Sequence, residues 1–206
     1  ICQIQLNRKA GMTFASGLRS VLRQDPDIVM VGEIRDKETA DIGIRAALTG
    51  HKVLSTLHTN DACESATRLL DMGVEPFLVS STLLAALAQR LVRRICKDCA
   101  EQFEAPAKYL RIMKLKPAGD GPVLFSKGAG CPKCAKTGFK GRLGVYEVLE
   151  NDSNIQELIL KRAASHEIRR AAVEKKTFKT LAHNAALKVF KGDTSFEEYM
   201  SIAFEE

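Results

Sequence analysis

The sequence lacks any segment long and apolar enough to cross a bilayer. Its longest apolar run extends from Phe77 to Ala88 and is interrupted by Ser80, Ser81 and Thr82. This run falls short of the roughly 20 residues that a spanning helix needs. The chain also begins with neither an initiator Met nor a signal peptide. We therefore expect a piece of a longer protein, without a transmembrane segment in this piece.

A phosphate-cradling loop is also missing. No stretch matches G-x-x-x-x-G-K-S/T, the loop whose backbone amides and lysine hold the phosphates of a nucleotide. We therefore expect the chain by itself to bind ATP weakly. Internal repeats and low-complexity tracts are absent as well. Because 45% of the residues are hydrophobic, the chain can form one large or two small domains with a buried core.

Positive charge is concentrated in one part of the chain. The sequence has 31 basic and 25 acidic residues, a net charge of +6. Residues 1–94 contribute +2, residues 95–142 contribute +6 and residues 143–206 contribute −2. A basic protein often binds nucleic acid or an anionic membrane. Here the surplus lies in one block, which indicates a local docking surface.

Hydrophobic spacing in the first part of the chain predicts alternating strands and helices. This order is typical of an α/β layered sheet with mostly parallel strands, whose ligands bind at the strands' carboxyl ends. The strand Ile28–Val31 is a continuous apolar run, so we expect it to be buried on both faces. The expected elements are a strand from Ile1, a helix over 13–23 capped by Thr13, the strand 28–31, a helix over 37–48, a strand over 53–57 and a helix through Met72 that Asn60 or Asp61 can cap.

The composition and the hydrophobic periodicity of the sequence change after residue 94. Pro76 is expected to open a long apolar helix that runs through Val92. Residues 95–142 are rich in Lys, Gly and Pro and show little periodicity, so we expect an insert held by something other than a hydrophobic core. Ordinary pattern then returns: a strand over 145–149, helices over 155–162, 166–175 and 181–190, and a last helix with Ser195 and Glu198 as its capping box.

Four of the six cysteines form two C-x-x-C pairs, Cys96 with Cys99 and Cys131 with Cys134. Four thiolates with two-residue spacers suit tetrahedral zinc, and a site filled entirely by protein ligands is structural. A redox dithiol and unrelated free thiols are the alternatives. The spacing favours zinc over a disulfide framework. It also suits a reducing compartment, so we expect the protein to be cytosolic.

An acidic residue, Glu33, follows the apolar strand in DPDIVMVGEIRD. In P-loop nucleotide hydrolases a carboxylate at this position reaches the magnesium ion, because the strand end points at the phosphates. The alternative is a merely solvated carboxylate. Gly32 also occupies a place where many such enzymes have Asp.

Two histidines flank the next strand in TGHKVLSTLHTND. His51 and His58 are seven residues apart, and an odd separation directs them to opposite faces of a strand. They are therefore not expected to share a metal. His58 follows the strand's carboxyl end, where it can donate to a phosphate in the same crevice as Glu33; the alternative is a capping or core histidine.

Several arginines are candidates for phosphate or intersubunit contacts, although each is equally consistent with a surface ion pair. Spacing alone does not choose among Arg19, Arg23, Arg35, Arg90, Arg93 and Arg94.

Taken together, these motifs resemble the secretion ATPase superfamily, specifically the assembly ATPases of type II secretion and type IV pili. The similarity covers nearly the whole chain in order and begins after the family's P-loop and acidic Asp box, so both are missing. It rests on LRSVLRQDPDIVMVGEIRD, AALTGHKVLSTLHTNDA, AQRLVRRICKDC, GCPKCAKTGFKGRLGVYEVL and a helical tail.

This resemblance implies roles for particular residues. Glu33 matches the Walker B glutamate that acts on magnesium, and Arg35 and Asp36 match the end of that signature. His51 and His58 match the His box, with His58 reaching the γ-phosphate. The four cysteines match the tetracysteine zinc motif. The water-activating glutamate of the family belongs to the Asp box, so this role is not assigned to Glu33.

The resemblance also implies an architecture and a biological setting. The fold is expected to be the C-terminal part of a RecA-like sheet over 1–95, a tetracysteine zinc subdomain over 96–142 and a helical subdomain over 143–206. Family members are cytoplasmic hexamers that use ATP, Mg²⁺ and Zn²⁺ and dock on an inner-membrane platform protein. Pilus assembly and type II secretion are not separated by this sequence.

A different class of function is a zinc-stabilised module whose basic insert binds nucleic acid or acidic lipid. Proteins that bind single strands stack bases on aromatic side chains set among basic residues. The insert has only four scattered aromatics, so direct nucleic-acid binding is not expected: Phe103, Tyr109, Phe125 and Phe139.

Overall fold

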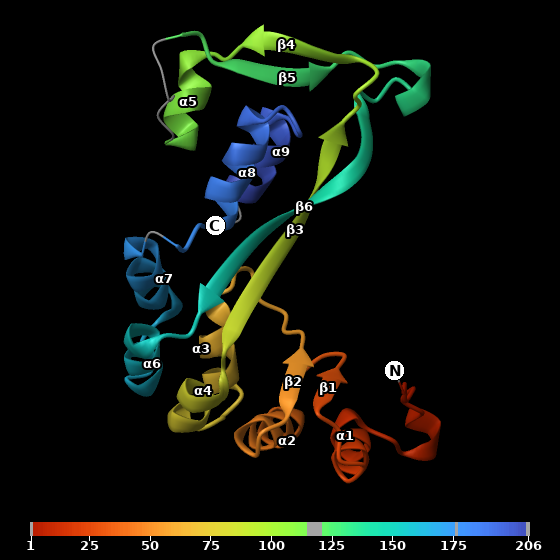
Figure 1. Ribbon diagram of the computed structural model, residues 1–206, viewed down its shortest axis with the longest axis vertical. Coiled ribbons are helices and arrows are strands. Elements are labelled where there is room, and N and C mark those ends of the chain that lie inside the picture. The colour runs from red at the N-terminus through yellow and green to blue at the C-terminus, as the bar shows by residue number, and fades with distance from the viewer. Residues whose placement is uncertain (1, 115–120, 176, 205–206) are drawn as a thin grey trace. The chain divides into compact units, whose positions relative to one another are not determined.

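The computed structural model describes residues 2–114, 121–175 and 177–204 (Figure 1). The chain divides into two compact units. Unit 1 comprises residues 1–86 with 149–174, and unit 2 comprises residues 87–148 with 175–206. The tail predicted over 143–206 thus contributes helices to both units.

Unit 1 contains a β-α-β motif. Strands β1 (Ile28–Val31) and β2 (Lys52–Ser55) pair in parallel, with Ile28 opposite Lys52 and Val31 opposite Ser55. Helix α2 (Lys37–Leu48) connects them, and α1 (Phe14–Leu22) precedes β1. The predicted α/β alternation is confirmed for this part of the chain.

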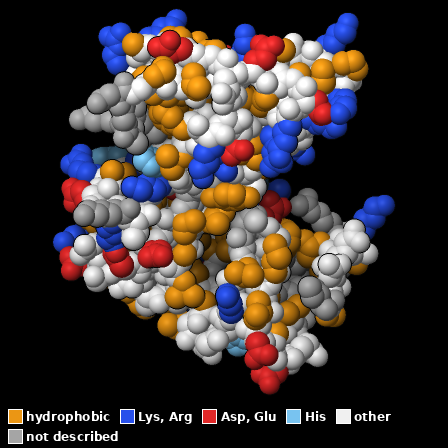
Figure 2. Space-filling view, turned by 45° about the horizontal axis from the view of Figure 1, so that its top comes forward, with side chains coloured by type: hydrophobic (Ala, Val, Ile, Leu, Met, Phe, Trp, Pro, Cys, Tyr) orange, Lys and Arg blue, Asp and Glu red, His pale blue; other side chains and the backbone are white. Residues whose placement is uncertain are grey.

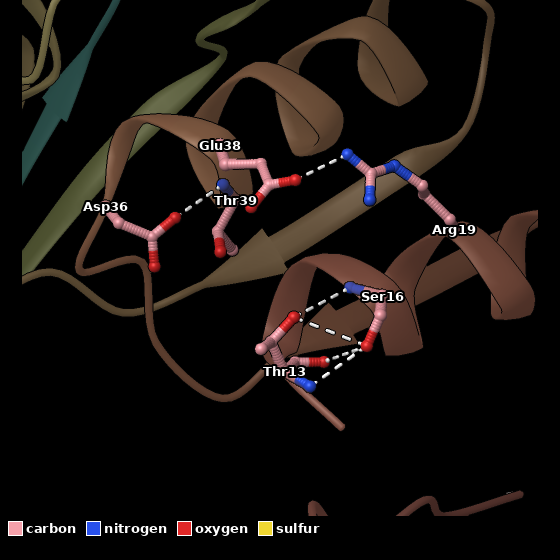
Figure 3. A network of polar contacts seen from close by, with 6 residues as sticks. All are labelled: Thr13, Ser16, Arg19, Asp36, Glu38 and Thr39. Atoms are coloured by element: carbon pink, nitrogen blue, oxygen red, sulfur yellow. Dashed lines mark hydrogen bonds and ion pairs between the residues drawn. The ribbon is translucent and has the colours of Figure 1, made fainter. Parts of the chain in front are cut away.

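Side-chain caps fix the starts of both helices (Figure 3). Thr13 and Ser16 form a capping box at α1, in which each hydroxyl accepts the other residue's amide N–H, at 3.1 and 2.9 Å. Asp36 caps α2 by accepting the Thr39 amide N–H at 2.8 Å. Helix α2 therefore begins immediately after the Glu33 segment.

Only one face of the β1–β2 pair is buried. Leu18, Val29 and Val31 form its core with partly buried neighbours from α1 and α2. On the opposite face Ile28 and Met30 are 62% and 71% exposed. The prediction of burial on both faces was wrong, because these helices cover one face. Figure 2 shows that hydrophobic side chains reach the surface in several places.

The strand predicted at the N-terminus does not form over residues 2–7, and Ile1 lies outside the described residues. The chain instead makes a short 3₁₀ turn at Arg8–Ala10, where the Asn7 carbonyl accepts the amide N–H groups of Ala10 and Met12 at 3.0 and 3.1 Å. Alternation alone predicted the strand, but a strand also needs a neighbour to pair with.

The described residues of unit 1 form four further helices, of which α3 packs against α7. Across the described residues, no helix has both the length and the apolar character needed to cross a membrane. The four are α3 (Glu64–Asp71), α4 (Pro76–Thr82), α6 (Ser153–Leu160) and α7 (Ser165–Glu174).

The long helix predicted from Pro76 is wrong beyond Thr82, where the chain turns into strand β3 (Ala85–Ile95). Ala86, Ala88 and Val92 are buried whereas Leu87 and Leu91 are exposed, which is a strand period. The small buried alanines hid this alternation. In addition, the Asn151 amide donates to the carbonyls of Ser80 and Leu83 at 2.9 and 2.7 Å, which helps to end α4.

The described residues of unit 2 include two strand pairs, and the strands of one pair, β3 and β6, each continue from one unit into the other. Strand β3 pairs with β6 (Phe139–Glu150), and β4 (Ala100–Glu104) pairs antiparallel with β5 (Leu124–Gly128). The remaining elements are helices α5 (Ala107–Met113), α8 (Leu181–Phe190) and α9 (Phe196–Ala203) and the 3₁₀ turn η2 (Pro132–Cys134).

An aromatic core joins the basic insert to the tail helices within unit 2. Phe125 of β5 is fully buried and meets Phe190 of α8 edge-on, with ring centroids 5.5 Å apart. Tyr109 of α5 stacks on Phe196 of α9 at 3.7 Å. The insert was expected to lack a core; it has one because distant tail residues supply half of it.

The predicted capping box of α9 forms only in part. Ser195 Oγ accepts the Glu198 amide N–H at 3.4 Å. The Glu198 carboxylate instead accepts the backbone N–H of Arg93 at 2.7 Å and its guanidinium Nε–H at 2.9 Å. A charged partner in β3 thus replaces the local amide that a capping box would use.

Candidate functional site

Two predicted site residues meet at the carboxyl ends of β1 and β2. Glu33 follows β1 and His58 follows β2. Contacts continue beyond the strands, since Ile34 N–H donates to the Thr56 carbonyl at 3.0 Å and Thr56 Oγ1 donates to the Gly32 carbonyl at 2.7 Å. This alignment brings the two side chains together, as the parallel arrangement predicts.

Glu33 Oε2 is the centre of this cluster. It lies 2.6 Å from Arg35 Nε and 3.2 Å from His58 Nε2. The Glu33 side chain is 21% exposed, whereas those of Arg35 and His58 are 56% and 78% exposed. The Arg35 hydrogen bond, reinforced by His58, lowers the pKa of Glu33. Glu33 is therefore an ionised carboxylate at neutral pH.

This arrangement combines the two kinds of group that bind a metal–phosphate complex. An ionised carboxylate suits a hard divalent cation such as Mg²⁺, directly or through water. Arginine and histidine N–H groups donate to phosphate oxygens. Glu33, Arg35 and His58 all lie at the sheet edge where α/β proteins bind ligands.

The structure does not bring His51 to this cluster. His51 precedes β2, at the opposite end of the strand from His58. Its Nδ1 lies 3.0 Å from the Ala46 carbonyl oxygen and 3.2 Å from Thr49 Oγ1, at the end of α2. In this position His51 caps the helix C-terminus.

Besides Arg35, two of the candidate arginines take part in ion pairs, each within a single unit. Arg19 pairs with Glu38 at 2.6 Å, which links α1 to α2 (Figure 3). Arg93 pairs with Glu198 and lies over the Phe139 ring, 4.2 Å from its centroid. Both arginines thus join secondary-structure elements of their own unit.

A further network beside His58 was missed by the sequence analysis. Asp61 is buried and pairs with Arg169 of α7, 108 residues later in the chain. Asp61 Oδ1 also accepts the Glu64 amide N–H at 2.9 Å. The sequence signal was limited to a possible helix cap at Asp61, because nothing local points to an arginine so distant.

The four cysteines of the C-x-x-C pairs converge within unit 2, with their sulfur atoms all within 4.8 Å of one another. The sulfur–sulfur distances are 3.9 Å for Cys96–Cys131 and for Cys99–Cys134, and 3.8 Å for Cys131–Cys134. A tetrahedral zinc site with bonds of about 2.3 Å has sulfur–sulfur edges of about 3.8 Å. The cluster therefore has the dimensions of such a site.

Close backbone packing holds this cluster in shape. A Cβ at Gly128 would lie 2.0 Å from the Gly138 carbonyl oxygen, so only glycine fits there. Gly138 N–H and Cys131 N–H donate to Cys134 Sγ at 3.3 and 3.2 Å. The Cys131 amide is the main cause that lowers the pKa of Cys134 to about 6, whereas burial raises the pKa of Cys99 to about 12.

Solved ATPase structures share this fold. The Legionella pneumophila ATPase DotB aligns with a TM-score of 0.64 and 24% identity over 94% of this chain and 43% of that chain. The pilus retraction motor PilT with bound ADP aligns with a TM-score of 0.60 and 26% identity over 92% and 43%. The chain thus has the α/β fold of these ATPases.

The chain belongs to the family described as Type II/IV secretion system protein, whose model matches residues 1–201. The type II secretion system ATPase E of Vibrio cholerae is 49% identical over 100% of this chain and 40% of its own length. The type IV pilus assembly ATPase PilB of Thermus thermophilus is 46% identical over 100% and 23%. The chain therefore spans less than half of these relatives, and the predicted family resemblance is confirmed.

Proposed function

We propose that the chain is the C-terminal portion of a hexameric ATPase that powers type IV pilus assembly or type II protein secretion. The observation that carries this proposal is the convergence of Glu33, Arg35 and His58 at the carboxyl ends of two parallel strands. The secretion and pilus ATPases among the relatives support it.

Within this proposal each residue of the cluster has its own task. Glu33 holds Mg²⁺, directly or through water, and its lowered pKa keeps it in the charged form. His58 and Arg35 are exposed and donate to phosphate oxygens. Bound Mg²⁺ neutralises phosphate charge during hydrolysis. His51 remains a proposed nucleotide-binding residue through the family's His box, although its contacts here are those of a helix cap.

Zinc fits the tetracysteine cluster of Cys96, Cys99, Cys131 and Cys134. The sulfur–sulfur distances match a tetrahedral site, and the amides on Cys134 stabilise a thiolate. Zinc bound by four protein ligands joins the two C-x-x-C turns and leaves no open position for catalysis. We therefore assign it a structural role.

The proposed setting follows the family. The RecA-like part is assigned to 1–95, the zinc subdomain to 96–142 and the helical subdomain to 143–206. The parent protein acts in the cytoplasm as a homo-hexamer, held at the inner membrane by a platform protein. Direct contact with nucleic acid is not part of this proposal.

The alternative, a zinc-stabilised module that binds nucleic acid or acidic lipid, has less support. Base stacking needs accessible aromatic faces. In the insert Phe125 is fully buried, Tyr109 is stacked on Phe196, and Phe139 lies beneath Arg93. These rings are used in packing, so the basic charge of the insert lacks the stacking surface of such a module.

The proposal is tested by comparing the parent protein with this chain alone. The parent protein should hydrolyse ATP. The chain alone should not, because its 206 residues contain no P-loop. Both are assayed for phosphate release at equal concentration. Hydrolysis by the purified chain, or its absence in the intact parent protein, would overturn the proposal.

A further inference from the structure

Arg169 of α7 contacts the segment that carries His58, although 111 positions separate the two residues in the sequence. Its Nη2 donates to Asp61 Oδ2, and both side chains are largely buried, at 23% and 11% exposure. All of these residues belong to unit 1, where α3 and α7 pack together.

The partner of Arg169 organises the start of α3. Asp61 Oδ1 accepts the Glu64 amide N–H at 2.9 Å, and Glu64 Oε2 accepts the Asn60 amide N–H at 2.8 Å. Two carboxylates thus fasten the backbone from Asn60 to Glu64 in both directions. Because a buried carboxylate is costly without a charged partner, this arrangement depends on Arg169.

The placement of His58 depends in turn on this backbone. Its side chain is 78% exposed, so few packing contacts restrain the ring that lies 3.2 Å from Glu33. On one side of His58 the chain is held by the Thr56 hydroxyl on the Gly32 carbonyl, at 2.7 Å. On the other side it is held by Asp61.

We propose that Arg169 is a positioning residue, which holds the Asn60–Glu64 segment through Asp61 and thereby sets His58 beside Glu33. Its effect on catalysis rests on the proposed function, whereas its effect on the segment does not. Arg169 touches neither the cluster nor a nucleotide in this account; it acts through Asp61.

The first test is amide hydrogen exchange in the full-length parent protein carrying Arg169→Met. Exchange at Asn60 and Glu64 should accelerate about tenfold or more, the effect expected when a buried charged hydrogen bond is lost. Arg170→Met is the matched control, because Arg170 is the neighbouring and exposed arginine of the same helix. It should leave exchange unchanged. Arg169→Lys keeps a charge and should restore part of the protection.

The second test is kinetic. Arg169→Met should lower kcat for ATP hydrolysis about tenfold with little change in KM, because His58 is displaced while the rest of the site remains. Arg169→Lys should recover part of the rate, which a purely global loss of stability would not explain. If Arg169→Met fails to fold, Asp61→Asn removes the same ion pair and should give the same pattern.

The two tests separate the inference from the proposed function. Unchanged exchange at Asn60 and Glu64, or equal acceleration by Arg170→Met, would overturn the role of Arg169. Accelerated exchange with an unchanged kcat would show that Arg169 holds the segment but does not affect catalysis. Absence of hydrolysis in the wild-type parent would refute the proposed function instead. The exchange result would still test whether Arg169 holds the Asn60–Glu64 segment.

Discussion

Replacing Phe125 with alanine should strongly destabilise unit 2. The ring is fully buried and has aromatic neighbours in β4, α5 and α8: Phe103 at 6.3 Å, Tyr109 at 6.5 Å and Phe190 at 5.5 Å between centroids. A buried phenylalanine truncated to alanine costs about 3–5 kcal/mol, and the upper part of that range applies where the cavity cannot collapse. For a small unit this corresponds to a fall of about 2 M in the urea midpoint.

The chain provides a selective assay for this change. It contains no Trp and three Tyr, and Tyr109, Tyr146 and Tyr199 all lie in unit 2. Tyrosine fluorescence during urea unfolding therefore reports this unit. Phe77→Ala is the matched control, since Phe77 is 60% exposed and belongs to unit 1. A loss below about 1 kcal/mol for Phe125→Ala, a value typical of surface sites, would refute the shared aromatic core.

Two further predictions concern the metal and the acidic site. Metal analysis of the purified chain should find about one zinc per chain, retained in Cys2→Ser and lost in Cys131→Ser; equal content in both variants would exclude the four-cysteine site. Because the pKa of Glu33 is depressed from its ordinary value near 4.5, its ion pairs stabilise the fold above that pH and are lost as pH falls through the depressed pKa. The stability difference between wild type and Glu33→Gln, followed by circular dichroism, should therefore shrink below pH 4.5; a difference that grows there would contradict the assignment.

Local signals predicted several elements well. The helices over 37–48 and 181–190 have the expected bounds, and Thr13 caps α1 as expected. Glu33 and His58 were placed together because parallel strands present their carboxyl ends at one edge. Each of these features depends on neighbouring residues or on one simple rule of sheet geometry.

The features that the sequence did not predict depend on distant partners. Asn151 helps to end α4 near residue 83, and tail residues Phe190 and Phe196 complete the core of the insert. Arg169 reaches Asp61 across 108 positions. Hydrophobic periodicity carries no information about such distant pairs. The predicted helix from Pro76 was therefore too long, and the insert was predicted to have no hydrophobic core.

The central claim is that Glu33 acts on the metal–nucleotide complex, and kcat for ATP hydrolysis by the full-length parent protein carrying Glu33→Gln tests it most directly. Glu38→Gln is the matched control, because Glu38 is an exposed glutamate of α2 paired with Arg19. The account predicts that Glu33→Gln lowers kcat by about 10²-fold or more, the scale of losing one charged group that stabilises the transition state, while Glu38→Gln retains wild-type turnover. Equal turnover in the two variants would contradict it.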